Sequence, residues 1–370
     1  MLQISVPTLL IDTEKAKRNI ARMARKAASA RCTFRPHFKT HQSVEIGEWY
    51  KEHGVSRIAV SSLRMAEKFA NAGWEDILVA IPVNIAEIDR INELAKGKGL
   101  KLGIVVECDI AIAMLSRDLK QAVDLFIEID TGYHRTGIEW DDFGGIDRSL
   151  DRIKEAELIT FKGIMTHAGN TYKCIGEDRE ENRQNILDIH ADCLNKLKKI
   201  KDRYQDEYPD MIISYGDTPS CTLADEFGPV NEIRPGNFIF YDLMMEQMGV
   251  CKAKDIAIAM ACPVIGVISE RQEVAIYGGG VHFSKEFLTI GDSRIFGRMV
   301  QNFSWGWGDI IPDATIVGLS QEHGLVRIEN FVAFSHIGIG DILTFLPVHS
   351  CLTANSMGQY LSFDGGLIIP

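Results

Sequence analysis

The chain has 370 residues, of which 46% are hydrophobic and 25% charged, and its 40 basic and 51 acidic side chains give a formal net charge of −11. This composition is typical of a folded globular protein of two or three domains and excludes a disordered, collagen-like or small disulfide-stapled chain. An acidic surface repels nucleic acid and anionic membranes, so we expect a small-molecule partner.

The eight cysteines are scattered and form no CxxC pair, which favours reduced thiols in a cytoplasmic protein. The N-terminal apolar stretch is broken by Pro7, and no later segment reaches the roughly 18 apolar residues of a membrane span. We therefore expect neither export nor a membrane anchor.

Short apolar, β-branched runs alternate with longer segments of helical period over the first two-thirds of the chain, which predicts a parallel sheet built from β–α units. Eight strands are predicted, at residues 32–38, 57–61, 77–81, 102–106, 124–129, 160–165, 211–215 and 231–234. Helices are predicted between them, for example at residues 14–29 and 179–204. Eight strands with intervening helices favour a (β/α)8 TIM-like barrel over an open doubly wound sheet.

From about residue 250 the pattern changes to strand-like runs separated by Gly and Pro. Strands are predicted at residues 256–268, 273–277, 314–319, 324–328 and 341–346. We therefore expect a barrel domain over residues 12–247 and a second, mostly β domain over residues 248–370. Residues 1–11 are expected to add an edge strand to this second domain, because an edge tolerates Pro7.

Polar side chains follow the first predicted strand, at the barrel mouth where such folds place their active sites. The segment RPHFKTH (residues 35–41) surrounds Lys39 with an arginine and two histidines. Neighbouring cations disfavour the ammonium form of a lysine, which frees the amine to hold an aldehyde as a Schiff base. From this loop alone, an ordinary solvated lysine remains the simpler interpretation.

Glycine-containing turns follow four other predicted strands and change that interpretation. They are DTGYHRTG (130–137), THAGNTY (166–172), YGDTPS (215–220) and RPGNF (234–238). The first directs a fixed cation, Arg135, over the mouth, and the last two are adjacent turns rich in free backbone N–H groups that suit a phosphate. A Schiff-base lysine and a phosphate cradle in one mouth predict pyridoxal 5′-phosphate as the cofactor.

These motifs resemble a known family. RPHFKTHQ, DTGYHRTG, THAGNTY, YGDTPS and IRPGNFIFYD are similar to motifs of the alanine racemase-like, fold type III pyridoxal phosphate enzymes, and within them to the D-serine dehydratase and D-threonine aldolase branch. The resemblance runs from VPTLLID at residues 6–12 to HSCLTAN at residues 349–355, which is nearly the whole chain.

The resemblance implies a role for each motif residue. Lys39 is expected to bind the cofactor covalently, Arg135 to contact its ring, and Tyr172 to lie near the reacting carbon. The phosphate is expected to be held by Gly216, Thr218, Gly236, Asn237 and Tyr241. Arg234 is an alternative arginine for the ring nitrogen, so the roles of the two arginines stay open, and His167 is a candidate to flank the ring.

Near the C-terminus, the segment PVHSCLT (residues 347–353) contains the pair His349 and Cys351. Residues i and i+2 face the same side of a strand, so on a strand the two side chains would bind one ion, although two ligands alone are a weak signal. The pair resembles a zinc site of D-serine dehydratases, whereas D-threonine aldolases and 3-hydroxyaspartate-cleaving relatives carry H-x-D. Because a thiolate favours zinc, we predict Zn²⁺, with Mn²⁺ or Mg²⁺ as alternatives.

Together with these features, the resemblance implies a pyridoxal phosphate-dependent lyase that acts on D-3-hydroxy amino acids. Metal-assisted loss of the β-hydroxyl, after Lys39 has removed the α-proton, would convert D-serine or D-threonine to a 2-oxo acid and ammonia. The alternative is aldolase-type cleavage to glycine and an aldehyde. An amino-acid racemase fits less well, because residues 250–370 contain no tyrosine motif assignable as a second acid/base.

A non-catalytic pyridoxal phosphate-binding protein also fits less well, because such barrels of the superfamily are single-domain chains. We assign no chemistry to the glycine-rich segment 278–285. The resemblance implies a homodimer with the site near the subunit interface.

Overall fold

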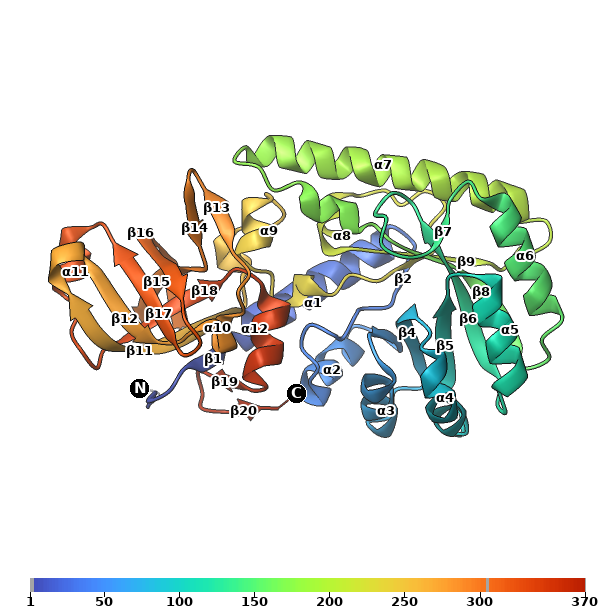
Figure 1. Cartoon of the computed structure of the whole chain (residues 1–370), viewed down its shortest axis with the longest axis horizontal. Helices are drawn as coiled ribbons and strands as arrows, with labels where there is room; N and C mark the ends of the chain where they lie inside the picture. The colour runs from blue at the N-terminus through green and yellow to red at the C-terminus, as the bar shows by residue number, and fades with distance from the viewer. Residues whose placement is uncertain (1–2, 304–305, 370) are drawn as a thin grey trace.

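In the computed structural model, which describes residues 3–303 and 306–369, eight parallel strands form one sheet in the order β2-β10-β9-β8-β6-β5-β4-β3 (Figure 1). A bridge between His37 and Ala59 brings the two ends of this sheet together, with the Phe38 amide donating to the Ala59 carbonyl at 2.8 Å. The predicted TIM-like barrel and its eight strands are confirmed. The strands are β2 (Thr33–Phe34), β3 (Arg57–Val60), β4 (Asp76–Pro82), β5 (Lys101–Val106), β6 (Val123–Asp130), β8 (Ile159–His167), β9 (Ile212–Gly216) and β10 (Glu232–Ile233).

Helices surround the barrel (Figure 1). The buried apolar residues of these helices and of the strands form one hydrophobic core. The Asp12 side chain begins α1 by accepting from the Lys15 amide at 2.9 Å, and the buried stripe of α1 follows helical spacing. The helices predicted at 14–29 and 179–204 are present as α1 and α7. The barrel helices are α1 (Thr13–Ser29), α2 (Val44–Lys51), α3 (Leu63–Asn71), α4 (Ile88–Ala95), α5 (Asp109–Asp118), α6 (Phe143–Lys154), α7 (Arg179–Tyr204) and α8 (Thr218–Leu223), with 3-10 turns η1 (Ile85–Glu87), η2 (Gly169–Lys173) and η3 (Asn237–Ile239) and the short strand β7 (Ile138–Glu139).

A nine-stranded sheet lies beside the barrel, in the order β12-β17-β16-β15-β18-β11-β1-β19-β20. The five strands predicted for this region are present, and pairing is antiparallel except between β1 and β19. Its strands are β1 (Thr8–Ile11), β11 (Ile258–Ile268), β12 (Glu273–Tyr277), β15 (Gly297–Phe303), β16 (Gly306–Leu319), β17 (His323–Ile328), β18 (Ile342–Pro347), β19 (Tyr360–Ser362) and β20 (Leu367–Ile368).

The N-terminal strand differs from the expectation of an edge strand. β1 pairs with β11 on one side and with β19 on the other, so it lies inside the sheet. Pro7 precedes the strand, and therefore its missing N–H removes no bond from either ladder. Residues 1 and 2 of the expected segment lie outside the described residues.

Short helices connect the two regions, and further helices and a hairpin accompany the C-terminal sheet. The chain leaves the barrel through α9 (Leu243–Gln247) and η4 (Ala253–Asp255), while η5 (Ser269–Arg271), α10 (Gly280–Phe283), the hairpin β13 (Leu288–Ile290) and β14 (Ser293–Ile295), α11 (Phe331–Ser335) and α12 (Ser350–Met357) belong to the C-terminal part. Figure 1 shows α12 at the side of the sheet that faces the barrel.

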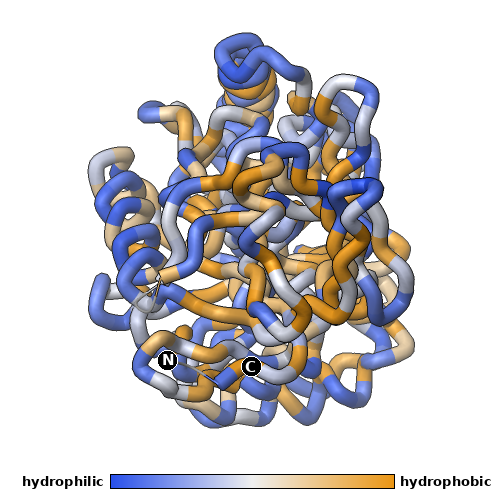
Figure 2. Tube along the Cα trace, turned by 90° about the vertical axis from the view of Figure 1, so that its left-hand side faces the viewer, coloured by the Kyte–Doolittle hydropathy of each residue, from blue (hydrophilic) through white to orange (hydrophobic). Residues whose placement is uncertain are grey.

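Apolar segments run through the interior of the C-terminal region while polar segments form most of its outer turns (Figure 2). All eight cysteines are free. Among the residues that the structure describes, no helix is long and apolar enough to cross a membrane.

Candidate active site

A cavity of about 450 Å³ lies at the carboxyl ends of the barrel strands, where α12 meets the barrel. Of the eleven residues to which the sequence analysis assigns a role, ten line this cavity and Tyr241 does not; His167, the candidate to flank the ring, lines it as well. The ten are Lys39, Arg135, Tyr172, Gly216, Thr218, Arg234, Gly236, Asn237, His349 and Cys351. Segments from five barrel strands and from the C-terminal region therefore converge on one space, as the position of active sites in TIM-like barrels requires.

Lys39 lies in the turn that follows β2, beside two half-buried histidines. Its amide donates to Nδ1 of His37 at 3.3 Å, and His167 contacts the Gly216 carbonyl through Nδ1 at 2.7 Å. Burial and the nearby Lys39 ammonium lower the pKa of His37 well below its ordinary value and lower the pKa of His167 to about 3. Both imidazoles are therefore neutral at physiological pH, and the lysine has uncharged neighbours on this side.

Two glycine turns form the part of the cavity that suits a phosphate. A Cβ atom on Gly216 would lie 2.9 Å from Cβ of Arg234, and one on Gly236 would lie 3.0 Å from the His37 carbonyl oxygen, so only glycine allows the turns to pack this closely. The buried Thr218 hydroxyl has no hydrogen-bond partner among the described residues. An unpaired donor beside closely packed turns fits the phosphate of pyridoxal phosphate.

Asp217, which the sequence analysis did not assign, also lies in this turn. Its carboxylate begins α8 by accepting from the Ser220 amide at 2.8 Å, and it accepts from the Thr171 hydroxyl at 2.9 Å. Burial raises the pKa of Asp217 to about 6, against the lowering effect of these hydrogen bonds. The signal available in the sequence was an Asp directly before Thr-Pro, the pattern of a helix N-cap with Pro in the first turn.

The two candidate ring arginines differ in burial and in partners. The Arg234 guanidinium is buried and donates to the Ser214 hydroxyl at 2.5 Å and to the Thr166 carbonyl at 2.8 Å. Arg135 is about half exposed, lies 5.2 Å from the Tyr133 ring centroid, and reaches Glu128 at 3.8 Å. Arg234 is thus held in one position, whereas Arg135 lies on a loop at the rim.

The two candidate tyrosines point in different directions. The Tyr172 hydroxyl, on η2, accepts from the Thr218 amide at 3.3 Å, and burial raises its pKa far above the ordinary value. The Tyr241 hydroxyl accepts from Arg22 of α1 at 3.2 Å and lies 3.3 Å from the Thr222 hydroxyl. Tyr241 therefore faces α1, and the structure does not place it with the other phosphate candidates.

The metal pair sits at the beginning of a helix, and the prediction that it lies on a strand is wrong. His349 is the N-cap of α12 and Cys351 is in its first turn. Burial alone would raise the pKa of Cys351 and lower that of His349, but hydrogen bonding between the two side chains outweighs it. His349 and the more distant Lys39 lower the pKa of Cys351. Cys351 in turn raises the pKa of His349 to about 9. A thiol with a lowered pKa beside a buried imidazole nitrogen without a partner fits a soft divalent metal ion.

Hydrogen bonds from the barrel hold this helix start in place. The Asp242 carboxylate accepts from the Ser350 amide at 2.9 Å, and Nδ2 of Asn237 donates to Asp242 at 2.7 Å and to the Ser350 hydroxyl at 2.9 Å. The Thr40 hydroxyl lies 3.3 Å from the Cys351 sulfur. The lysine turn and the phosphate turn thereby fix the metal pair relative to the barrel mouth.

The wall next to the metal pair is uncharged, and the sequence analysis did not find it. Gln42 donates to the Asn355 side chain at 2.9 Å, and both residues line the cavity with Leu352 and Met244. Gln42 lies three residues after Lys39 in the same motif, which was an available signal. Asn355 lies 313 residues away in sequence from Gln42, and only the fold brings them together.

Comparisons with known proteins match both regions of the chain. The sequence profile of the alanine racemase N-terminal domain matches residues 11–243, and that of a putative serine dehydratase domain matches residues 257–363. D-threo-3-hydroxyaspartate dehydratase from Delftia sp. is 30% identical over 99% of this chain and 97% of its own, and D-serine dehydratase from Dictyostelium discoideum is 29% identical over 96% and 93%. A 3-hydroxy-D-aspartate aldolase from Paracoccus denitrificans is 25% identical over 99% and 90%.

Solved structures show the same similarity in three dimensions. The Delftia dehydratase superposes with a TM-score of 0.87 at 28% identity, covering 99% of this chain and 96% of that chain. A cysteine-to-alanine variant of that dehydratase, described in its metal-free form, superposes with a TM-score of 0.88 at 27% identity, covering 99% and 97%.

Proposed function

The chain belongs to the alanine racemase-like, fold type III family of pyridoxal phosphate-dependent enzymes, in the branch of D-3-hydroxy amino acid lyases, and from this premise we propose that it dehydrates D-serine or D-threonine to a 2-oxo acid and ammonia. The observation that carries the proposal is the placement of His349 and Cys351 in the same cavity as Lys39. A metal-binding pair and a lysine amine in one cavity suit the removal of an α-proton followed by loss of a β-hydroxyl.

The cofactor would be bound through Lys39, with its phosphate at the turns of Gly216, Thr218 and Gly236, and it supplies an electron sink for charge that develops at the α-carbon. The Lys39 amine, once free of the cofactor, takes the α-proton. His37 and His167 beside it are neutral, so neither imidazole places a positive charge next to the amine. The Tyr172 hydroxyl accepts from the Thr218 amide, and with the cofactor bound Tyr172 would lie near the reacting carbon, as the resemblance implies.

The metal ion would be held by His349 and Cys351 and supplies Lewis acidity for departure of the β-hydroxyl. We propose zinc, because a thiolate and an imidazole are the ligands that zinc accepts readily, whereas magnesium and manganese favour carboxylate and water. The Thr40 hydroxyl, 3.3 Å from the Cys351 sulfur, supports the thiolate as a hydrogen-bond donor.

The uncharged wall supports substrates with a small neutral side chain. Gln42, Asn355, Leu352 and Met244 offer amide, aliphatic and thioether groups beside the metal pair. A β-carboxylate, as in 3-hydroxyaspartate, would have no guanidinium or ammonium partner on these four residues, and burying it unpaired is costly. This favours D-serine and D-threonine over 3-hydroxyaspartate.

Product analysis by NMR after incubation of the protein with D-threonine, pyridoxal phosphate and zinc tests the proposal. We expect 2-oxobutyrate and ammonia, and we expect the Cys351→Ala variant to lose bound zinc and turnover while keeping the cofactor absorption. Lys39→Ala, which should lose that absorption, is the matched control for cofactor attachment. Glycine and acetaldehyde as products would show that the aldolase alternative is right.

Three further properties belong to the proposal. We propose residues 12–247 and 248–370 as the two domains, a homodimer as the resemblance implies, and a reducing, cytoplasmic compartment, which the eight free thiols support. Sedimentation at several protein concentrations checks the dimer.

A further inference from the structure

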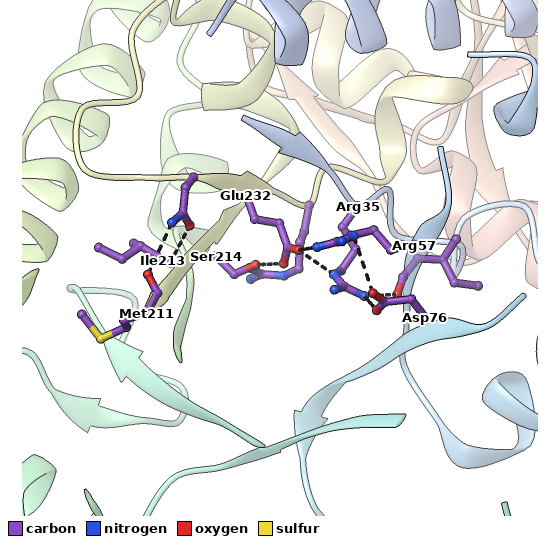
Figure 3. Close-up of polar contacts among 10 residues, drawn as sticks. Arg35, Arg57, Asp76, Met211, Ile213, Ser214 and Glu232 are labelled. Carbon is purple, nitrogen blue, oxygen red and sulfur yellow. Dashed lines mark hydrogen bonds and ion pairs between the residues drawn. The ribbon is translucent and has the colours of Figure 1, made fainter. Parts of the chain in front are cut away.

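Glu232 is almost fully buried inside the barrel and has two arginine neighbours. Its Oε2 accepts from Nε of Arg35 at 2.8 Å, and its Oε1 accepts from the Ser214 hydroxyl at 2.5 Å. Nη1 of Arg35 also donates to Oδ1 of Asp76 at 2.6 Å. Figure 3 shows Ser214, Glu232, Arg35 and Asp76 side by side across the interior of the barrel.

The Ser214 hydroxyl connects this ion pair to the floor of the active-site cavity. It donates its single hydrogen to Glu232, and it accepts from Nη1 of Arg234 at 2.5 Å. Each group therefore has the role that its chemistry allows: the guanidinium donates, the hydroxyl both accepts and donates, and the carboxylate accepts. Ser214 is fully buried, so no solvent competes for these bonds.

Arg234 needs this connection because it pairs with no carboxylate directly in the part of the chain that the structure describes. Its two direct partners are the neutral oxygens of Ser214 and Thr166. A buried guanidinium without an adjacent carboxylate is costly unless a nearby negative charge compensates it. Glu232, one hydroxyl away, supplies most of that charge, with a smaller contribution from Glu128, and Glu232 also fixes the direction of the guanidinium, which lines the cavity.

We propose that Glu232 is a positioning residue: through the Ser214 hydroxyl it holds the Arg234 guanidinium in a fixed place at the floor of the cavity, where this cation faces the bound cofactor. This inference rests on the proposed binding of pyridoxal phosphate. A fixed cation at the ring controls where negative charge settles in the cofactor, so the network reaches the chemistry without touching the substrate.

The test uses the full-length protein loaded with pyridoxal phosphate and two variants of the network. Ser214→Ala removes the connecting hydroxyl but keeps the Arg35–Glu232 pair, and Glu232→Gln removes the charge. The readouts are the absorption band of the bound cofactor titrated with pH, kcat and KM for D-serine, and the melting temperature. Glu273→Gln is the matched control, because Glu273 is buried in the C-terminal sheet and joins Arg271 and Arg327.

For both network variants we expect the pH midpoint of the cofactor band to shift by about one unit and kcat to fall by about tenfold, with a smaller change in KM. Glu273→Gln should lower only the melting temperature. A lower melting temperature with an unchanged spectral titration and kcat in Ser214→Ala would overturn the inference. If Glu232→Gln does not fold, the result for Ser214→Ala alone supports or overturns the inference. A wild-type protein that shows no cofactor band would instead overturn the proposed function.

Discussion

The barrel interior has two unlike halves. Strands β3, β4, β5, β6 and β8 contribute an apolar half, consisting of Ala59, Leu78, Val105, Phe126 and Met165. Strands β9 and β10 and the segment after β2 contribute an ionic half, consisting of Ser214, Glu232, Arg234 and Arg35, with Arg57 and Asp76 at its base. The apolar half is the usual filling of such a barrel, and the ionic half is the exception.

The difference shows how one scaffold separates stability from chemistry. Close packing in the apolar half stabilises the barrel without specifying a direction for any group. Buried ions cost desolvation energy, but hydrogen bonds to them specify distances and angles. The ionic half includes Arg234, which lines the cavity, so the buried ions occur where a charged group must be held in place.

The largest expected effect comes from removing one ion of the ionic half. Arg35→Met leaves Glu232 buried beside only the more distant Arg57, at 3.8 Å. We expect the free energy of unfolding to fall by about 4 kcal/mol, because breaking one side of a buried ion pair leaves an uncompensated charge. Urea denaturation monitored by circular dichroism measures this change.

Two further variants sharpen that result. Leu78→Ala, in the apolar half, should lower the free energy of unfolding by about 3 kcal/mol through the cavity it creates, yet leave the spectrum of bound cofactor unchanged.

The double variant Arg35→Met with Glu232→Gln should be destabilised by about 1 kcal/mol or more less than the sum of the two single variants, because it no longer leaves an unpaired buried charge. Additive effects in this double-mutant cycle would contradict the view of the ionic half as one coupled network.

A smaller effect concerns pH, since four histidines of the barrel have lowered pKa values, and two of them, His37 and His167, line the cavity. Burial lowers the pKa of His37, His41, His167 and His190, with that of His41 at about 3. The unfolded chain then binds more protons than the folded one as pH falls through about 6.5, so folding is progressively destabilised below that pH. We expect the unfolding free energy to decrease between pH 7 and pH 5, by up to about 1.4 kcal/mol per pH unit for each histidine.

His41→Gln isolates one of these contributions. His41 does not line the cavity, and its Nε2 is buried without a partner among the described residues. The variant should show a shallower decrease of unfolding free energy from pH 7 to pH 5 than the wild-type protein. Parallel curves for the two proteins would mean that His41 is protonated to the same extent in the folded and unfolded states.

The strands that carry the apolar half were predictable from the sequence, because short apolar, β-branched runs are a local pattern. The ionic half was not, since Arg35 and Glu232 are 197 residues apart and their pairing depends on the sheet order. The motif residues were found by their position after strands. The expectation of a strand at His349 and Cys351 was wrong, because the two residues begin α12. The contact of Tyr241 with Arg22 of α1 joins residues 219 apart in the sequence, and only the barrel fold brings them together.

The smallest expected effect lies at the phosphate turn, where Asp217 places a carboxylate next to the proposed cofactor phosphate. Its folded pKa of about 6 means that it is charged at pH 8 and largely neutral at pH 5. Asp217→Asn keeps an acceptor for the Ser220 amide and the Thr171 hydroxyl but removes the charge, so pyridoxal phosphate should bind about threefold more tightly than to wild type at pH 8. At pH 5 the two affinities should converge, because the wild-type side chain is then protonated. Titration of the cofactor-free protein at both pH values measures this, and an equal difference at pH 5 and pH 8 would show that the effect is steric.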